Sequence, residues 1–149
     1  MTTVAWDGKS LAADRRVTAN GFIVTEWTKV HRREDGALIG VAGEMCTASE
    51  FVRWFMTNDS EVEMPSLKAK VSTEECAVAI IVDADGVVTA FDRDGWHVVE
   101  SKRYAVGSGA NLAAMAMRCG KSAARAVELA SEFDIYTGSR VDVLHYGST

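Results

Sequence analysis

The run Cys76-Ala77-Val78-Ala79-Ile80-Ile81-Val82 is almost continuously apolar, and it is followed by Asp85-Gly86 and by Val87-Val88-Thr89-Ala90-Phe91. Such a run is typical of a strand whose two faces are both covered. An Asp-Gly pair tolerates the positive φ that a tight hairpin turn requires. The stretch therefore predicts a central antiparallel hairpin that is buried on both sides.

Asp-Gly pairs recur between other strand-like runs, at Asp7-Gly8, Asp35-Gly36 and Asp94-Gly95. The first separates residues 3–6 from residues 10–13, and the second separates residues 28–31 from residues 37–41. We therefore expect two antiparallel hairpins near the start of the chain. Residues 140–144 predict a last strand.

Helical patterns occur in two regions. Thr47-Ala48-Ser49-Glu50 has the spacing of a capping box and leads into an apolar stripe, so we expect a helix that ends near Asn58. Residues 110–118 and 122–133 also have apolar residues at helical spacing, with Cys119-Gly120 as the break. The second of these stripes contains Ala123, Val127, Ala130 and Phe133.

The expected order is strands, helix, strands, two helices and a strand. Hairpins covered by separate groups of helices predict a layered α+β sandwich of antiparallel sheets. The chain has 149 residues, which suffices for one globular domain over residues 1–149 without disulfide bonds. Its 16 Lys and Arg against 21 Asp and Glu give a net charge of −5, so we expect no nucleic-acid partner.

The cysteines Cys46, Cys76 and Cys119 cannot all pair with one another and show no C-x-x-C spacing. This usage is typical of a reducing compartment, so we expect buried thiols and a cytoplasmic location. The first residues lack a basic region followed by an apolar stretch, and nowhere do about 18 apolar residues run together. We expect neither a signal peptide nor a membrane-spanning segment.

The histidines are isolated from one another, at positions His31, His97 and His145. Metal sites usually combine ligands at short spacing, so we expect ordinary strand residues, no metal and no cofactor. Gly107-Ser108-Gly109 lacks the third glycine of a dinucleotide-binding motif and by itself predicts a turn into a helix.

The N-terminus offers another chemistry. Removal of Met1 would leave Thr2 first in the chain, with a free α-amine beside its own hydroxyl. Such an amine has a pKa of about 7.7–8.0 and can accept the hydroxyl proton while the oxygen attacks a carbonyl group. While Met1 is attached, the Thr2 nitrogen is an amide and cannot act as a base. A Met-Thr start is common and alone indicates nothing.

Further motifs give this start a context. The chain opens with Thr2-Thr3-Val4-Ala5, continues with Ala-Ala-Asp-Arg-Arg-Val-Thr over residues 12–18 and Phe22-Ile23, and then has Lys29-Val30. These stretches resemble the mature start and the lysine strand of proteasome β-subunits. Three later stretches resemble that family's glycine turn, its G-S-G helix start and the end of its last long helix: Val41-Ala42-Gly43, Val106-Gly107-Ser108-Gly109-Ala110 and Asp134-Ile135-Tyr136-Thr137. The bacterial HslV peptidase has a similar I-Y-T stretch.

The resemblance covers nearly the whole chain and implies the four-layer αββα sandwich of N-terminal nucleophile hydrolases. It implies that Thr2 is the nucleophile and that its amine is the general base. Lys29 would lower the pKa of the amine or the hydroxyl, Asp14 would hold Lys29 in place, and the N–H of Gly43 would stabilise the oxyanion.

By the same resemblance, Ser108, Asp134 and Thr137 would form a hydrogen-bonded shell around the amine. Structural roles remain alternatives for all of these residues. Asp14 and Lys29 can be an ordinary exposed pair, Ser108 a helix cap, and Asp134 and Thr137 the end of a helix. The stretch between Phe55 and Cys76 is shorter than in members of the family, so we expect a reduced helical layer there.

The resemblance implies a threonine peptidase of the proteasome/HslV kind that hydrolyses polypeptides inside a homo-oligomeric ring fed by an AAA+ unfoldase. Trp54, Met115 and Met117 are candidates for subunit contacts or for the core. Two other functions remain open: a non-catalytic assembly or binding protein with the same fold, and an amidohydrolase that acts on a small amide.

Overall fold

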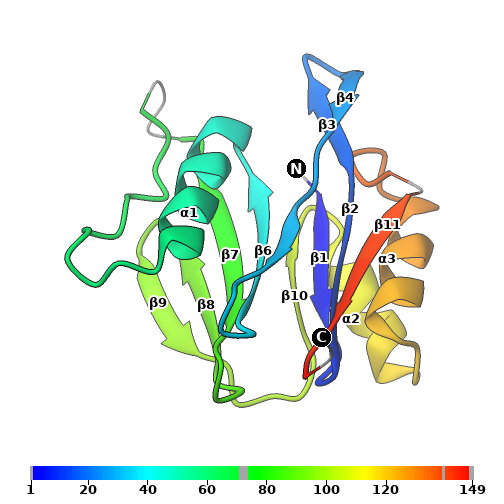
Figure 1. The fold of residues 1–149 in the computed structure, drawn as a ribbon. Helices are drawn as coiled ribbons and strands as arrows, with labels where there is room; N and C mark the ends of the chain where they lie inside the picture. Colours follow the sequence, from blue (N-terminus) through cyan, green and yellow to red (C-terminus); the bar gives the residue numbers. More distant parts are fainter. Residues whose placement is uncertain (1, 71–73, 139, 148–149) are drawn as a thin grey trace.

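The computed structural model describes residues 2–70, 74–138 and 140–147. Within these residues the elements are β1 (Thr3–Trp6), β2 (Ser10–Asp14), β3 (Arg16–Ala19), β4 (Phe22–Glu26), β5 (Val30–Arg32), β6 (Leu38–Gly43), α1 (Met45–Thr57), β7 (Ala77–Val82), β8 (Val88–Asp92), β9 (Gly95–Val98), β10 (Tyr104–Gly107), α2 (Ala110–Arg118), α3 (Ala123–Ser131) and β11 (Val141–His145) (Figure 1).

The described strands form two main antiparallel sheets. One has four strands in the order β10-β1-β2-β11, and the other has five in the order β5-β6-β7-β8-β9. Figure 1 shows α1 on the outer side of the five-stranded sheet and α2 and α3 on the outer side of the four-stranded sheet. The predicted α+β fold, a four-layer αββα sandwich, is confirmed.

Alternating side chains build the layers, because successive residues of a strand point to opposite faces. In β7, Ile80 and Val82 pack between the two sheets, whereas Ala77 and Ala79 pack under α1. In β1, Val4 belongs to the core between the sheets. Both faces of β7 are therefore covered, which explains its nearly continuous apolar sequence.

Small residues fill the third core, between the four-stranded sheet and its helices. Ala5 of β1 and Ala12 of β2 contact Ala113, Ala126 and other residues of α2 and α3. Alanine side chains let the helices lie close to the sheet.

The predicted capping box at Thr47 is wrong, because α1 begins earlier. Its N-cap is Glu44, whose carboxylate accepts hydrogen bonds from the backbone N–H groups of Cys46 and Thr47 at 3.0 and 2.7 Å. Burial alone would raise the pKa of Glu44, but these bonds and that of the Thr47 hydroxyl outweigh it and hold the pKa below its usual range. The helix ends at Asn58 as expected, with that residue in the left-handed conformation.

The two later helices are confirmed, but the second is shorter than predicted. α3 ends at Ser131, and Phe133 is 75% exposed instead of continuing the apolar stripe. Met117 is buried in the helix core, whereas Met115 is exposed and Trp54 packs on Phe51. Of the three candidates for subunit contacts, Met115 alone has its side chain mainly in solvent.

Burial of the cysteines was predicted and is wrong. Cys46 and Cys119 are exposed, and Cys76 is half-buried. Cys46 lies in the exposed first turn of α1, and Cys119 is the C-cap of α2, so the ends of the helices bring both thiols to the surface. The three histidines lie in strands as expected, in β5, β9 and β11.

Two strand regions were not predicted. β3 and β4 form a two-stranded hairpin around Asn20-Gly21, both with positive φ, and the hairpin projects beyond the main sheets in Figure 1. β10 pairs with β1 across about a hundred residues of sequence, from Thr3↔Gly107 to Trp6↔Tyr104. Local patterns carry little information on such distant pairing.

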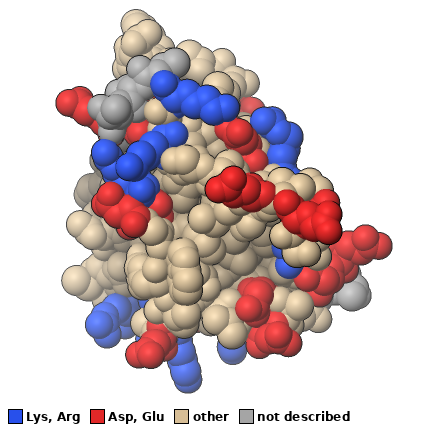
Figure 2. All heavy atoms as spheres, turned by 90° about the vertical axis from the view of Figure 1, so that its left-hand side faces the viewer, with Lys and Arg blue, Asp and Glu red and all other residues tan. Residues whose placement is uncertain are grey.

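The helical layer over the five-stranded sheet was expected to be reduced, and that comparison with the family stays a prediction. Among the described residues the layer contains α1 and the irregular segment after it, whose Leu67 and Ala69 are buried. Basic and acidic side chains are interspersed over this face (Figure 2). No helix among the described residues is both long enough and apolar enough to span a bilayer.

Candidate active site

The candidate site lies where the two sheets meet. Thr2 directly precedes β1, Asp14 is the last residue of β2, and Lys29 directly precedes β5. Asp14 belongs to the four-stranded sheet and Thr2 adjoins its strand β1, while the carbonyl group of Lys29 accepts a hydrogen bond of 3.0 Å from Val41 N of the other sheet. Sheet packing therefore brings together residues that are far apart in sequence.

The Thr2 hydroxyl contacts both charged side chains. It donates a hydrogen bond to Asp14 Oδ1 and accepts one from Lys29 Nζ. Lys29 Nζ also lies 3.3 Å from Asp14 Oδ2 and donates a hydrogen bond of 2.5 Å to the carbonyl oxygen of Arg16. Thr2, Asp14 and Lys29 are 1%, 0% and 4% exposed, so the alternative of an ordinary exposed ion pair is wrong.

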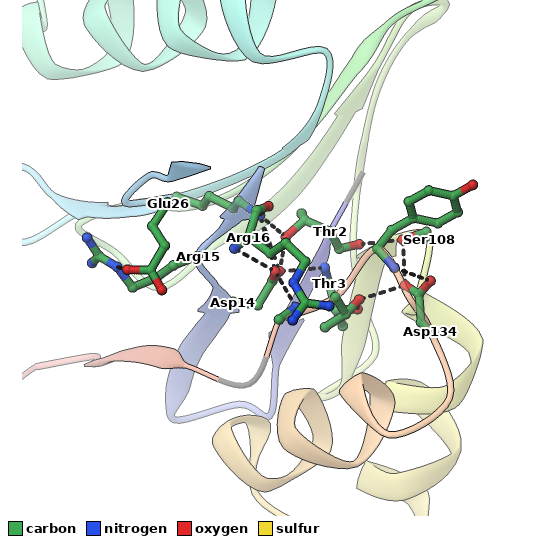
Figure 3. Close-up of polar contacts among 12 residues, drawn as sticks. Thr2, Thr3, Asp14, Arg15, Arg16, Glu26, Ser108 and Asp134 are labelled. Carbon is green, nitrogen blue, oxygen red and sulfur yellow. Dashed lines mark hydrogen bonds and ion pairs between the residues drawn. The ribbon is translucent and has the colours of Figure 1, made fainter. Parts of the chain in front are cut away.

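Asp14 is held by backbone groups as well as by Lys29. Its carboxylate accepts hydrogen bonds from the N–H groups of Thr3 at 3.1 Å, Arg16 at 3.0 Å and Gly138 at 2.8 Å. A buried carboxylate needs such partners, because an unsatisfied charge in the interior is costly. The three bonds fix the carboxylate beside Thr2 (Figure 3).

Burial lowers the pKa of the Lys29 ammonium, because removal from water disfavours its charged form. The carboxylate of Asp14 acts in the opposite sense, and the positive charge of Arg16 lowers the pKa further. The site therefore contains a cation that loses its proton more readily than an exposed lysine does.

Ser108, Asp134 and Thr137 also converge. Both hydroxyl groups donate hydrogen bonds of 2.6 Å to Asp134 Oδ2. Burial alone would raise the pKa of Asp134, but the bonds from Ser108, Thr137 and the Tyr136 N–H outweigh it and hold the pKa below its usual value.

This group reaches the N-terminal strand by two contacts. Ser108 Oγ donates a long hydrogen bond of 3.4 Å to the carbonyl oxygen of Thr2, and the hydroxyl groups of Thr137 and Thr3 lie 2.7 Å apart. The observed bond from Ser108 is to the Thr2 carbonyl group. The predicted shell around the α-amine itself stays a prediction.

Glycine is required at two positions around the site. Gly43, at the end of β6, has a φ of 99°, and a side chain there would collide with the carbonyl group of Cys76. Gly107 also has a φ of 99°, and a side chain there would collide with the carbonyl group of Thr2. Positive φ favours glycine. That the Gly43 N–H binds an oxyanion stays a prediction.

Sequence reasoning missed three contributors, Thr3, Arg16 and Gly138. Arg16 contributes its carbonyl oxygen to Lys29, and Gly138 contributes its N–H to Asp14. Every residue type carries the carbonyl group and every type except proline the N–H, so side-chain identity gives almost no signal for them. Of the three, Thr3 alone could have been found from its side chain, because it places a second hydroxyl group next to Thr2.

A cavity of about 260 Å³ is lined by Trp27, Met45, Cys46, Ser49 and Arg53. Trp27 is two residues before Lys29, and Met45 is two residues after Gly43. Within the described residues, no group of three or more His, Cys, Asp and Glu side chains could hold a metal ion. That the protein needs no metal or cofactor stays a prediction.

The arrangement of layers defines the fold of the N-terminal nucleophile hydrolases, and solved structures bear out the resemblance. HslV from Trypanosoma brucei matches with a TM-score of 0.72 and 22% identity, over 96% of this chain and 98% of that one. BPH from Thiobacillus denitrificans, in complex with epoxomicin, matches with a TM-score of 0.71 and 20% identity, over 99% and 100%. A second BPH structure has a TM-score of 0.67 and 19% identity, over the same shares.

No protein-family model and no curated protein matches the sequence. At these identities the solved structures show the fold, and the chemistry must be argued from the chain's own residues.

Proposed function

We propose that this protein is a threonine-type peptidase of the proteasome/HslV kind, which hydrolyses peptide bonds through an acyl ester on Thr2 after removal of Met1. One observation carries the proposal: the Thr2 hydroxyl contacts a buried Lys29–Asp14 ion pair. Burying two charges costs free energy, and placing them at one hydroxyl suits a chemical role better than a structural one.

In the first half of the reaction, Thr2 Oγ attacks the carbonyl carbon of the scissile peptide bond while the free α-amine accepts the hydroxyl proton. The tetrahedral intermediate then collapses, the C–N bond breaks, and the α-amine gives the proton to the leaving amine. The acyl group remains as an ester on Thr2. A water molecule then attacks the ester, with the same amine as base, and releases the carboxylic acid and the free hydroxyl.

The remaining residues act on charge and position. Lys29 is positive beside the hydroxyl and stabilises the developing alkoxide, and Asp14 holds Lys29 there. The N–H of Gly43 binds the oxyanion, an interaction whose loss in other enzymes costs about 100- to 1000-fold in rate. Ser108, Asp134 and Thr137 orient the amine.

The cavity beside Trp27 and Met45 accepts a substrate side chain. Its lining includes Trp27, two residues before Lys29, and Met45, two residues after Gly43, which supports a place for the substrate near both segments. Its mainly apolar lining favours an uncharged side chain.

We further propose that the peptidase works in the cytoplasm as a homo-oligomeric ring, with polypeptide substrates delivered by an AAA+ unfoldase. Exposed apolar side chains on the projecting hairpin and on α2, such as Phe22 and Met115, support subunit contacts. A ring would keep the nucleophiles away from folded proteins.

The test compares three forms of the protein: one in which cleavage of an N-terminal fusion leaves Thr2 as the first residue, one that retains Met1, and a Thr2→Ala variant. Intact mass identifies the terminus. We expect the first form alone to cleave peptides and to gain the mass of one epoxomicin molecule. Retention of Met1 in all of the native protein would favour a non-catalytic role, and cleavage of small amides but no peptides would favour an amidohydrolase.

A further inference from the structure

Arg15 follows Asp14 directly and is directed away from Thr2, toward Glu26 (Figure 3). Successive side chains of an extended chain point to opposite sides, so Asp14 faces the site and Arg15 faces away from it. Arg15 Nη1 donates hydrogen bonds to Thr28 Oγ1 at 3.0 Å and to Asp142 Oδ2 at 2.7 Å. The side chain is 25% exposed.

The bond to Thr28 runs beside the ion pair of the site. Thr28 directly precedes Lys29, so Arg15–Thr28 and Asp14–Lys29 are two adjacent links between the same two chain segments. A third link is the backbone hydrogen bond of 2.9 Å from Trp27 N to the Arg15 carbonyl oxygen. Together the links fix the distance between the segment that carries Asp14 and the one that carries Lys29.

The bond to Asp142 anchors this arrangement to the four-stranded sheet. Asp142 belongs to β11, which pairs with β2 in the register Val141↔Asp14 and Asp142↔Ala13. Glu26 is a weaker neighbour: its Oε2 lies 3.9 Å from Arg15 Nε, too far for a hydrogen bond, and is held at 2.8 Å by Arg140. Asp142 is therefore the principal anchor of the guanidinium.

We propose that Arg15 is a positioning residue for the Thr2 reaction: its guanidinium clamps Thr28 to Asp142 and so holds the Lys29 ammonium against the Thr2 hydroxyl. The inference rests on the proposed function. A guanidinium can direct two N–H groups of one nitrogen to two acceptors in a fixed geometry. An ammonium on the shorter lysine side chain cannot replace it.

Arg15 affects Lys29 by holding its chain segment in place and not through the electrostatic effect of its own charge. Burial lowers the pKa of Lys29, and the charges that shift this pKa are those of Asp14 and Arg16. Arg15 instead bonds Thr28, the residue that directly precedes Lys29 on the same segment. Loss of this contact would let Lys29 move away from Thr2 and would admit water beside it.

The test uses the form in which Thr2 is the first residue and measures the rate of covalent labelling by epoxomicin. In Arg15→Ala, Arg15→Lys and Thr28→Val, we expect the maximal rate to fall about 10- to 100-fold, since small displacements of reacting groups have effects of this size. The half-saturating concentration stays unchanged. Arg125→Ala removes an exposed Arg–Glu pair of 3.0 Å on α3 and serves as the matched control with wild-type labelling.

The pH profile separates positioning from general destabilisation. If Arg15→Ala admits water to Lys29, the pKa of Lys29 rises again and labelling should continue to higher pH than in the wild type. A variant that is only less stable should label more slowly but lose labelling at the same alkaline pH as the wild type. A lower rate with the wild-type alkaline limit overturns the inference about Arg15 and leaves the proposed function standing. Wild-type labelling of Arg15→Ala does the same. If Arg15→Ala does not fold, wild-type labelling of Thr28→Val overturns it. Failure of the wild-type protein to react overturns the proposed function, and the inference with it.

Discussion

The Lys29 ammonium lies 3.3 Å from the Asp14 carboxylate, and the two side chains are only 5% and 0% exposed. Removal of two charges from water is costly, and their attraction offsets the cost only if further hydrogen bonds satisfy both groups. Here Asp14 accepts three backbone N–H groups, and Lys29 donates to the Arg16 carbonyl group. Both ions therefore stay in place beside Thr2.

Replacement of Lys29 by alanine should abolish turnover while the fold remains. The positive charge beside the Thr2 hydroxyl is lost, and loss of one preorganised electrostatic group lowers catalytic rates by about 100- to 1000-fold. Asp14 keeps its three backbone hydrogen bonds, so the variant should fold with reduced stability. Peptide hydrolysis gives the rate, and circular dichroism reports the fold.

The matched control is Lys121→Ala, at an exposed lysine after α2. It removes the same charge from the chain and should keep wild-type activity. Unchanged activity in Lys29→Ala would remove Lys29 from the mechanism.

The activity should decline on the alkaline side below the ordinary lysine pKa of 10.5. Burial lowers the pKa of Lys29, and the reaction needs the charged form, so activity is lost as pH rises through the lowered value. On the acid side it needs the unprotonated α-amine of Thr2. Initial rates over a range of pH should give a bell-shaped profile.

Lys29→Arg provides the check, because a guanidinium keeps its charge throughout this range. We expect a lower rate without the alkaline decline. The same alkaline decline in both proteins would assign it to another group.

Local chemistry made much of the fold predictable. Asp-Gly turns identified β1–β2, β5–β6 and β7–β8, and helical periodicity identified all three described helices. The β3–β4 hairpin has an equally strong turn signal in its own sequence, Asn20-Gly21. β10 was missed because its partner β1 is remote in sequence, and pairing at that distance depends on the packing of the whole chain.

The site was predictable where side-chain type carries the chemistry. Thr2, Asp14 and Lys29 do meet, and Ser108, Asp134 and Thr137 form one hydrogen-bonded group. The supports provided by Arg16 and Gly138 are backbone atoms and leave no trace in the sequence. The thiols were predicted to be buried from composition alone, which cannot tell whether a cysteine falls at a helix end.

Asp134→Asn should reduce stability at neutral pH more than in acid. Burial opposes ionisation of Asp134, but the bonds from Ser108 and Thr137 outweigh it and keep its folded pKa below the ordinary 3.8. A lowered folded pKa contributes stability above the unfolded value, and that contribution is lost as pH falls through the folded one. The difference in unfolding free energy between wild type and variant should therefore shrink below pH 3.8.

Urea unfolding at a series of pH values measures this difference. Asp94→Asn, at an exposed turn, controls for the removal of one negative charge. A difference that does not depend on pH would show that folding leaves the pKa of Asp134 unchanged.

Glu44→Ala should destabilise the protein by about 1 kcal/mol, the usual effect of losing a helix N-cap. The Glu44 carboxylate accepts the N–H groups of Cys46 and Thr47, which have no other partner within the first turn of α1. Glu50→Ala is the matched control, because it removes the glutamate of the sequence-predicted capping box. Glu50 instead pairs at 3.4 Å with the exposed Lys70, a contact worth about 0–1 kcal/mol. Urea unfolding should show that Glu44→Ala is the less stable variant. The reverse order would indicate that Thr47, and not Glu44, caps the helix.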